Sequence, residues 1–581
     1  MKKLITIALL VCTATVFAQH RKDTISTKVV DVVKSYVPTI ADAQKKIEDA
    51  KVKDSLTVRK KKINYTIYSV PVASTFVPEK GKASAVRQRI TREDYLDSYV
   101  GGGFGMLGTF YGDANITLPV NDNSNASFLV NHISAADPVR DVIPESAYSL
   151  SSAEAHYDFL NQDLAWGLGV DVGRRMHNWY GVKTGAFSQQ VISDLDDVRQ
   201  TYMDYGFAGY VKLSNPYFKG LDLSVRGLSD HFDSKELNVR ALPSFEVPVD
   251  DTQKVRANVI LDYYNGTFAR DKAYTLNRIE NRWMLFGVNP SYIFSIDNFD
   301  LKLGAAIYYA DANKSNESKF KAYPDVEATY TFNSDFIVNA GLRGALEQNT
   351  VERLSKANPF IAPMQEVKPT NVQADAFVGL RGKVSSDLLY RAQLSYRQYK
   401  EMPIFTTNNE EPTSGVERLA YQYKNSFTAL YDDVSDFEFM AGINGNVKDI
   451  LSFDLKGQYN AYAALNQIDK TAWNLPSVRV SLFTDFKILY NLFAGLDMFY
   501  VGKRYDLDYT TAVGVEPAKL TLDGYFDLNF HVDYTYKKHW QFFLKANNLA
   551  GKSYDLWAYY PSQSVQAFVG LRYLFNSISG R

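Results

Sequence analysis

The residues near the C-terminus alternate between apolar and polar positions with a period of two. From Ser564 to Phe575 every second residue is apolar, and most of the residues between them are small or polar, with Phe568 and Leu574 as exceptions. Because successive side chains of a strand point to opposite faces, this pattern predicts a strand with one face in lipid and the other in a wet interior. The apolar positions are Val565, Ala567, Val569, Leu571, Tyr573 and Phe575.

The same alternation recurs upstream as far as Tyr99, and the connections between the alternating segments come in two lengths. Short polar turns occur at 332–335, 385–387, 448–449 and 537–539. Long polar stretches occur near 135–147, 181–198, 268–278, 350–369, 400–434, 507–520 and 555–563. Outer-membrane barrels have short periplasmic turns and longer external loops. The chain is therefore expected to be an all-β transmembrane antiparallel barrel, and a soluble β-propeller or sandwich is the alternative.

The strand count depends on Tyr421 to Leu430, a segment that alternates but lies close to the next strand, 437–447. If this segment belongs to a long external loop, long and short connections alternate strictly and the barrel has about 22 strands. If some apparent strands are hairpins within loops, the count falls to roughly 18 or 20. The barrel is expected to span 98–575, with a C-terminal tail at 576–581.

The N-terminus predicts export. Lys2 and Lys3 precede an apolar run, 4–16, that is too short to span a bilayer, and Ala18 precedes an acceptable cleavage site. Residues 1–18 are therefore expected to be a signal peptide, and 19–97 a periplasmic or lumenal segment. Cys12 leaves a lipoprotein signal as the less favoured alternative. The expected location is the outer membrane.

Composition agrees with a barrel, because hydrophobic residues make up 46% of the chain and mean hydropathy is −0.25, yet Tyr (40) and Phe (35) are abundant. No stretch after Ala18 approaches the roughly 18 apolar residues of a membrane helix. The formal net charge of −1 gives no indication of a nucleic-acid partner.

The C-terminal stretch from Asp527 to Phe575 resembles the closing strands of TonB-dependent outer-membrane receptors. The resemblance lies in 543–549, in 552–554, in an aromatic loop with Trp557, Tyr559 and Tyr560, and in 570–575. The start of the barrel, 99–105 followed by 109–111, is similar to such receptors in the Bacteroidota. The resemblance implies outer-membrane lipid around the barrel, uptake or passage of a nutrient, and a TonB-like energising protein as partner.

The segment 19–97 is short for the plug that fills the barrel in this family, so a complete plug is not expected. A barrel of this width cannot be filled by side chains alone. The segment itself, inward-folded loops such as 350–369 and 400–434, or a second protein would then close it. The alternative to transport is a plugless docking scaffold that binds a periplasmic or surface lipoprotein.

Within the N-terminal segment, Val29, Val30, Val32 and Val33 form a β-prone run. In the receptor family a short extended stretch here adds as a strand to the energising protein, which is β-augmentation. The alternative is that the run packs inside the barrel.

The remaining candidates are weighed against simpler interpretations. The seven histidines are scattered and no catalytic constellation or metal-ligand spacing is found, so neither an enzyme nor a cofactor nor a metal site is expected, and His531 is expected to line the lumen. The acidic groups at 194–197 and 432–433 fit solvated loops better than calcium sites. Trp557, Tyr559 and Tyr560 would either stack a flat ligand or belong to an interfacial aromatic girdle, and the girdle is favoured. Gly101 to Gly103 are expected to let a neighbouring strand approach.

Overall fold

The computed structural model describes residues 96–576 except for 140–141, 143, 184, 189–190, 192–194, 196, 269–278, 313–318, 411–417 and 510–515. The predicted signal peptide, Val29, Val30, Val32 and Val33, and nearly all of the segment 19–97 lie outside the described residues.

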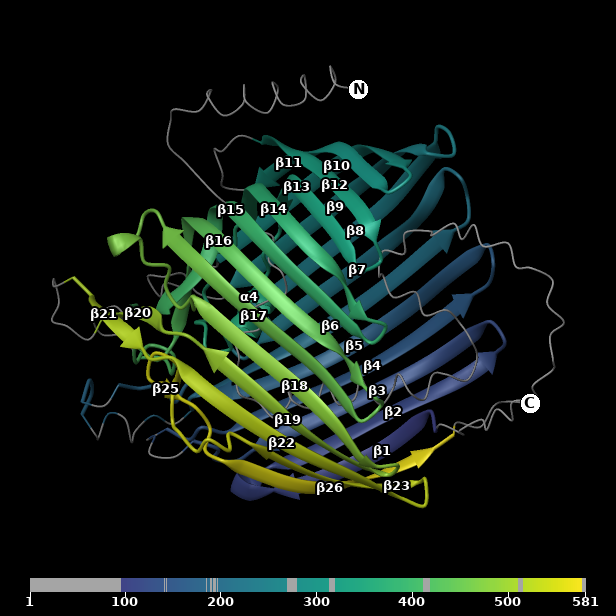
Figure 1. Ribbon diagram of the computed structural model, residues 1–581. Coiled ribbons are helices and arrows are strands. Elements are labelled where there is room, and N and C mark those ends of the chain that lie inside the picture. Colours follow the sequence, from purple (N-terminus) through teal and green to yellow (C-terminus); the bar gives the residue numbers. More distant parts are fainter. Residues whose placement is uncertain are drawn as a thin grey trace.

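Among the described residues, 22 strands form a single antiparallel sheet that closes on itself, because β26 pairs with β1 as well as with β23 (Figure 1). This confirms the predicted fold class and strand number. The strands are β1 (Ser98–Gly105), β2 (Phe110–Asn121), β3 (Ser124–Ala135), β4 (Tyr148–Leu160), β5 (Leu164–Asn178), β6 (Arg199–Leu213), β7 (Phe218–Asp230), β8 (Lys235–Pro248), β9 (Gln253–Phe268), β10 (Ile279–Ile296), β11 (Phe299–Ala312), β12 (Phe320–Asn333), β13 (Phe336–Glu347), β14 (Thr370–Ser385), β15 (Leu388–Thr407), β16 (Phe427–Val447), β17 (Leu451–Ala464), β18 (Val478–Leu489), β19 (Leu492–Val501), β22 (Tyr525–Tyr536), β23 (Trp540–Asn547) and β26 (Gln566–Phe575).

The other described elements lie in connections. Two small hairpins, β20 (Arg504–Asp508) with β21 (Ala518–Leu522) and β24 (Asp555–Trp557) with β25 (Tyr560–Pro561), are separate from the barrel sheet. The helical elements are α4 (Val351–Ala357), η1 (Met106–Gly108) and η2 (Ile468–Lys470). No helix among the described residues is long and apolar enough to cross a membrane.

Long and short connections alternate around most of the barrel, but not strictly as predicted, because the connections 106–109 (β1 to β2) and 231–234 (β7 to β8) are also short. All four predicted short turns join consecutive strands at one end, which we call the turn end. The long connections lie at the other end, which we call the loop end. Tyr421 lies in the connection between β15 and β16, whereas residues 427–430 begin β16. The predicted loop 400–434 is therefore too long, because β15 extends to Thr407 and β16 begins at Phe427, and these strand ends are paired.

The two faces of β26 differ as the alternation predicts. Val569 and Tyr573 point outward and are 47% and 42% exposed, whereas Gln566 and Arg572 are each 1% exposed. Phe568 breaks the pattern because its ring packs on the inner face, against Tyr111. Exposed Val, Leu, Ile and Phe side chains on strands all around the barrel make an apolar outer surface, which a soluble propeller or sandwich would not have.

The inner face of the barrel carries paired polar groups. On the wall formed by β14 to β16, Arg397 forms an ion pair of 2.6 Å with Glu438 and one of 3.4 Å with Asp375. His531 is 4% exposed and lies 3.0 Å from the carboxylate of Asp485. This confirms the expectation that His531 faces the interior.

The barrel closes where β1 meets β26, and glycines make this contact close. A Cβ atom at Gly101 would lie 2.3 Å from Cγ of Arg572, and one at Gly103 would lie 2.5 Å from the carbonyl oxygen of Val569. Gly101 and Gly103 are therefore needed for the approach of the neighbouring strand, as predicted, whereas a Cβ at Gly102 would meet only the carbonyl oxygen of Tyr111, at 3.4 Å. The Nη2 atom of Arg572 lies 2.6 Å from the buried carboxylate of Asp113 on β2. This ion pair ties the last strand to the beginning of the barrel.

Candidate functional site

The long connections fold inward at the loop end and pack together with the strand ends there. Their buried apolar side chains form the largest core of the described residues, which we call the loop-end cluster. An ordinary barrel strand buries no such core, so this cluster is the candidate functional site. Its buried members are Val139, Trp179, Tyr180, Tyr202, Leu228, Tyr264, Phe268, Val351, Leu354, Phe360, Ile361, Ala362, Met364, Val367, Tyr421, Phe427, Ala429, Val501, Tyr525, Leu556, Trp557, Ala558 and Tyr560.

The short helix α4 enters the cluster from the connection between β13 and β14. Its N-cap is Thr350, whose side chain accepts a hydrogen bond from the backbone N–H of Arg353 at 3.1 Å. The buried carboxylate of Glu236 on β8 accepts the N–H groups of Val351 and Glu352. These bonds satisfy first-turn donors that a helix cannot pair internally. The connection is thus fixed to β8, a barrel strand that is not adjacent to β13 or β14.

After α4 the chain runs alongside the start of β16. Ile361 forms a parallel bridge with Phe427, and the N–H of Ala362 donates to the carbonyl oxygen of Phe427 at 2.8 Å. Gln365, which is fully buried, donates to the carbonyl oxygens of Ala362 and Phe427 and accepts the N–H of Ala429 at 2.8 Å. The side chain of Gln365 and the backbone of Ile361 and Ala362 therefore hold this connection to the barrel strand.

Aromatic rings from three connections meet at Tyr560. The rings of Phe360 and Tyr560 stack with their centroids 3.8 Å apart, and Tyr180 meets Tyr560 edge-on at 4.8 Å. The indole N–H of Trp179 donates to the carbonyl oxygen of Phe360 at 3.2 Å. The amide of Asn425 donates to the carbonyl oxygen of Trp179 at 2.9 Å. The connections after β5, β13, β15 and β23 are thereby joined into one unit.

A buried carboxylate links two further connections, those after β17 and β19, to the end of β15. Asp506 on β20 is 0% exposed and accepts hydrogen bonds from the N–H of Thr407 at 3.0 Å and from the amide of Asn474 at 2.8 Å. Burial disfavours the charged form and raises the pKa of Asp506 to about 6, although these hydrogen bonds oppose the shift.

The hairpin of β24 and β25 is fixed by a buried arginine. Arg504 donates to the carbonyl oxygens of Asp555 and Leu556. Burial raises the pKa of Asp555, while the nearby Arg504 opposes that rise. At the edge of the cluster, Lys183 forms an ion pair of 2.7 Å with Asp508 and lies 5.5 Å from the ring of Tyr559.

The aromatic residues singled out from the sequence occupy this cluster. Trp557 is 4% and Tyr560 0% exposed, so the favoured interpretation of an interfacial girdle is wrong for both. A girdle residue would stay exposed on the outer surface, whereas these rings pack against Phe427 and Phe360. Tyr559 lies beside them and is half-buried. A role of the three residues in ligand binding stays a prediction.

The acidic residues predicted to be solvated also need correction. Asp432 lies within β16, is 2% exposed and accepts hydrogen bonds from the side chains of Asn466 and Gln467. It is therefore a structural carboxylate, because both donors come from the neighbouring connection. Asp197 is exposed and pairs with Arg199, whereas Asp194 and Asp196 lie outside the described residues. No group of three or more His, Cys, Asp or Glu residues suited to a metal ion occurs in the described part of the chain.

Sequence reasoning missed Phe360, Gln365 and Asp506. The only signal near the first two was the pair Pro359 and Pro363, which indicates irregular structure in that connection. The partners of these residues lie far away in sequence, and no local pattern pairs them.

Comparison with known proteins identifies the fold. No family model matches the chain, and no curated protein matches it. Among solved structures, the ferric-catecholate import receptor Fiu of E. coli K12 aligns with a TM-score of 0.59 at 10% identity, covering 82% of this chain and 81% of that one. The FrpB iron transporter of Neisseria meningitidis (F5-1 variant) gives 0.61 at 10% identity, with 82% of each chain covered. The ferripyoverdine receptor of the Pseudomonas aeruginosa outer membrane gives 0.58 at 12%, covering 82% and 71%. At these identities the likeness shows a shared fold.

Proposed function

We propose that this protein is an outer-membrane barrel that admits a nutrient, and that its own long connections close its external mouth. The observation that carries the proposal is the loop-end cluster inside a closed 22-strand barrel. A barrel of this size is too wide for its wall side chains to fill. The fold is shared with proteins described as an import receptor and an iron transporter, which supports a role in uptake.

The geometry suggests how access would be controlled. The connection that contains α4 and residues 358–367 lies between the β8–β9 wall and the start of β16, and it is held by hydrogen bonds at both sides. Releasing the Phe360–Tyr560 stack, the bonds of Gln365 and the backbone bonds of 360–362 to Phe427 would loosen this connection while leaving the barrel sheet intact. The connection is thus the element whose movement would open the mouth.

Energy for such a movement would come from the periplasmic side. We propose that the chain is exported by a cleaved signal peptide and that it is a Bacteroidota-type receptor without a complete plug. Val29, Val30, Val32 and Val33 would add as a strand to a TonB-like energising protein. Replacing these four residues by serine should abolish capture of the chain by that protein. Unchanged capture would contradict the coupling. The proposed role involves no catalysis and no cofactor.

Single-channel recording in planar bilayers tests closure of the mouth. The wild-type barrel should pass little current, and replacing 351–367 by a glycine–serine linker of equal length should produce large current steps. Replacing the turn 249–252 at the other end in the same way should change nothing. Equal, large currents in the wild type and the 351–367 variant would contradict closure by this connection. An absence of current in both would contradict passage through the barrel.

The alternative function is a docking scaffold for a periplasmic or surface lipoprotein. One observation favours it: the connections are cross-bonded through Asn425, Arg504 and Asp506, which gives the loop end a fixed shape suited to recognition. Under this alternative, purified wild-type barrel carries a stoichiometric lipoprotein and neither variant conducts. A barrel that purifies alone and conducts after replacement of 351–367 would exclude it.

A further inference from the structure

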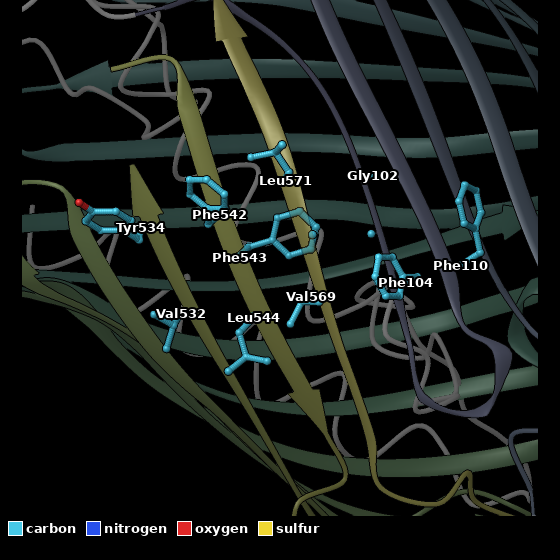
Figure 2. A pocket seen from close by; sticks show the side chains of 12 residues that line it. Gly102, Phe104, Phe110, Val532, Tyr534, Phe542, Phe543, Leu544, Val569 and Leu571 are labelled. Atoms are coloured by element: carbon cyan, nitrogen blue, oxygen red, sulfur yellow. The ribbon is translucent and has the colours of Figure 1, made fainter. Parts of the chain in front are cut away.

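An apolar groove lies on the outer face of the barrel at the junction of β1 and β26. It has a volume of about 740 Å³ and is lined by side chains of β22, β23, β26, β1 and β2. Figure 2 shows these side chains gathered around Gly102. The volume falls in the range of about 300–1,000 Å³ that is usual for small-ligand sites.

The groove exists because an outward position is occupied by glycine. Gly102 lies between Val100 and Phe104 on β1, and these two neighbours point outward with exposures of 48% and 71%. In the sheet Gly102 pairs with Leu571 on one side and with Gly112 on the other. The missing side chain leaves a floor flanked by projecting apolar groups. Behind the floor, on the inner side, the ring of Phe543 covers Gly570.

The chemistry of the groove selects a hydrocarbon. Phe104, Phe110, Phe542 and Leu544 offer no hydrogen-bonding group, and the hydroxyl of Tyr534 is the one polar side-chain group among the lining residues. The backbone beneath them belongs to the continuous pairing of β1 with β26 and β2, so no strand edge is open for another chain to add to. A molecule with polar groups along its length would lose hydrogen bonds to water on entering the groove. An apolar chain gains van der Waals contacts there without that cost.

The width of the groove favours a lipid chain over a protein partner. Neighbouring strands are about 4.8 Å apart, so the part of the groove directly above Gly102 is about as wide as a single methylene chain. A helix is about 10–12 Å in diameter and would rest on the rings of Phe104 and Phe110 without reaching the floor. The groove is also continuous with the apolar outer surface, which faces lipid on all sides.

We propose that this groove holds an acyl chain of a membrane lipid, which covers the seam where the first and last strands close the barrel. The bound chain fills the space above Gly102 and packs against Val569 and Leu571. Because the groove lies outside the lumen, its occupancy is independent of passage through the barrel.

Filling the groove tests this proposal. A Cβ at Gly102 would meet only the carbonyl oxygen of Tyr111, at 3.4 Å, so Gly102→Leu fits without displacing backbone. The matched control is Gly457→Leu on β17, where a Cβ has nothing within 4 Å. Gly457 shares the outward face of Tyr459, which is 47% exposed, and it lies outside the groove. Both variants add the same side chain to the lipid-facing surface.

Native mass spectrometry of barrel extracted in mild detergent, with phosphatidylethanolamine added back, gives the readout. The wild type and Gly457→Leu should retain one tightly bound lipid, and its occupancy should fall about tenfold in Gly102→Leu. Equal lipid retention in Gly102→Leu and the wild type would overturn the proposal. So would a second copy of the chain, or another protein, that is lost in Gly102→Leu in place of lipid. Folding of each variant is checked by heat-modifiable gel migration, and Gly102→Ala should give an intermediate loss of lipid.

Discussion

The outer surface of the barrel and the loop-end cluster use the same kinds of side chain in opposite ways. On the outer surface Phe104 and Val170 stand apart on alternate strand positions and are 71% and 51% exposed. In the cluster Phe360 and Tyr560 are 4% and 0% exposed and come from connections two hundred residues apart. The first arrangement needs lipid to be stable, and the second makes its own apolar environment. Removing apolar groups should therefore affect the two regions differently.

The largest difference should appear when one phenylalanine is truncated in each region. Phe360→Ala removes a buried ring and leaves a cavity against Tyr560, so it should lower the free energy of unfolding by about 3–5 kcal/mol. Phe104→Ala removes a mostly exposed ring and should cost less than about 1.5 kcal/mol. Urea titration in lipid vesicles measures both values. Equal costs would show that the cluster is not a packed core.

The outer surface is the region that the sequence predicted well. A two-residue period fixes which face each residue of β26 occupies, although Phe568 and Leu574 are apolar at positions where the pattern is otherwise small or polar. The number of strands was also predicted correctly, because short and long connections that alternate require an even number of strands. The ends of β15 and β16 were predicted wrongly. Asp432 and Asp433 were assigned to a loop because they are acidic, but they lie within β16.

The loop-end cluster could not be predicted in the same way. Trp557 and Tyr560 lie in a stretch without a repeating apolar pattern, so their burial could not be read from the sequence. Aromatic residues are equally typical of an interfacial girdle. Their environment depends on contacts with Phe360 and Phe427, which lie far away in the sequence. Contacts between residues so far apart in sequence leave no pattern in the residues around them. A single sequence therefore shows that these aromatic residues are unusual, but it does not show whether they are buried or what they contact.

A charge on the outer surface should give the second-largest effect. Val170→Lys places an ammonium group near the middle of β5 on the lipid-facing side, and it should destabilise the folded barrel by about 2–4 kcal/mol. Val249→Lys, in the turn after β8, should cost about 0–1 kcal/mol because that position lies near the interface. Refolding titrations into vesicles compare the two. A tolerated Val170→Lys would mean that this face does not contact lipid.

The pH dependence of the loop end should follow from Asp506. Its pKa in the folded state, about 6, is above the ordinary value of 3.8. The folded state therefore holds a proton that the unfolded state releases, and the contribution of this group to stability is lost as pH rises from about 4 to 6. The loss is at most about 3 kcal/mol.

The variant Asp506→Asn cannot ionise, so the difference in unfolding midpoint between wild type and variant should change across this pH range. The variant Asp449→Asn, in an exposed turn, serves as control and should follow the wild type. Thermal unfolding in detergent at pH 4 to 7 gives the comparison. Parallel curves for wild type and Asp506→Asn would contradict the assignment.

The smallest change in stability is expected for a variant that removes a hydrogen bond from the cluster and keeps the packing. Gln365→Leu keeps a side chain of similar size but leaves the N–H of Ala429 without its acceptor, which should cost about 1–3 kcal/mol. The comparison change Gln398→Leu affects a half-buried side chain of β15 whose bond to the hydroxyl of the exposed Tyr396 is 3.4 Å long, and it should stay within about 0.5 kcal/mol. Because Gln365 joins a connection to β16 and not one barrel strand to another, its loss should also raise bilayer conductance while leaving the barrel folded. Loss of stability without added conductance would show that Gln365 holds the core together and does not keep the mouth closed.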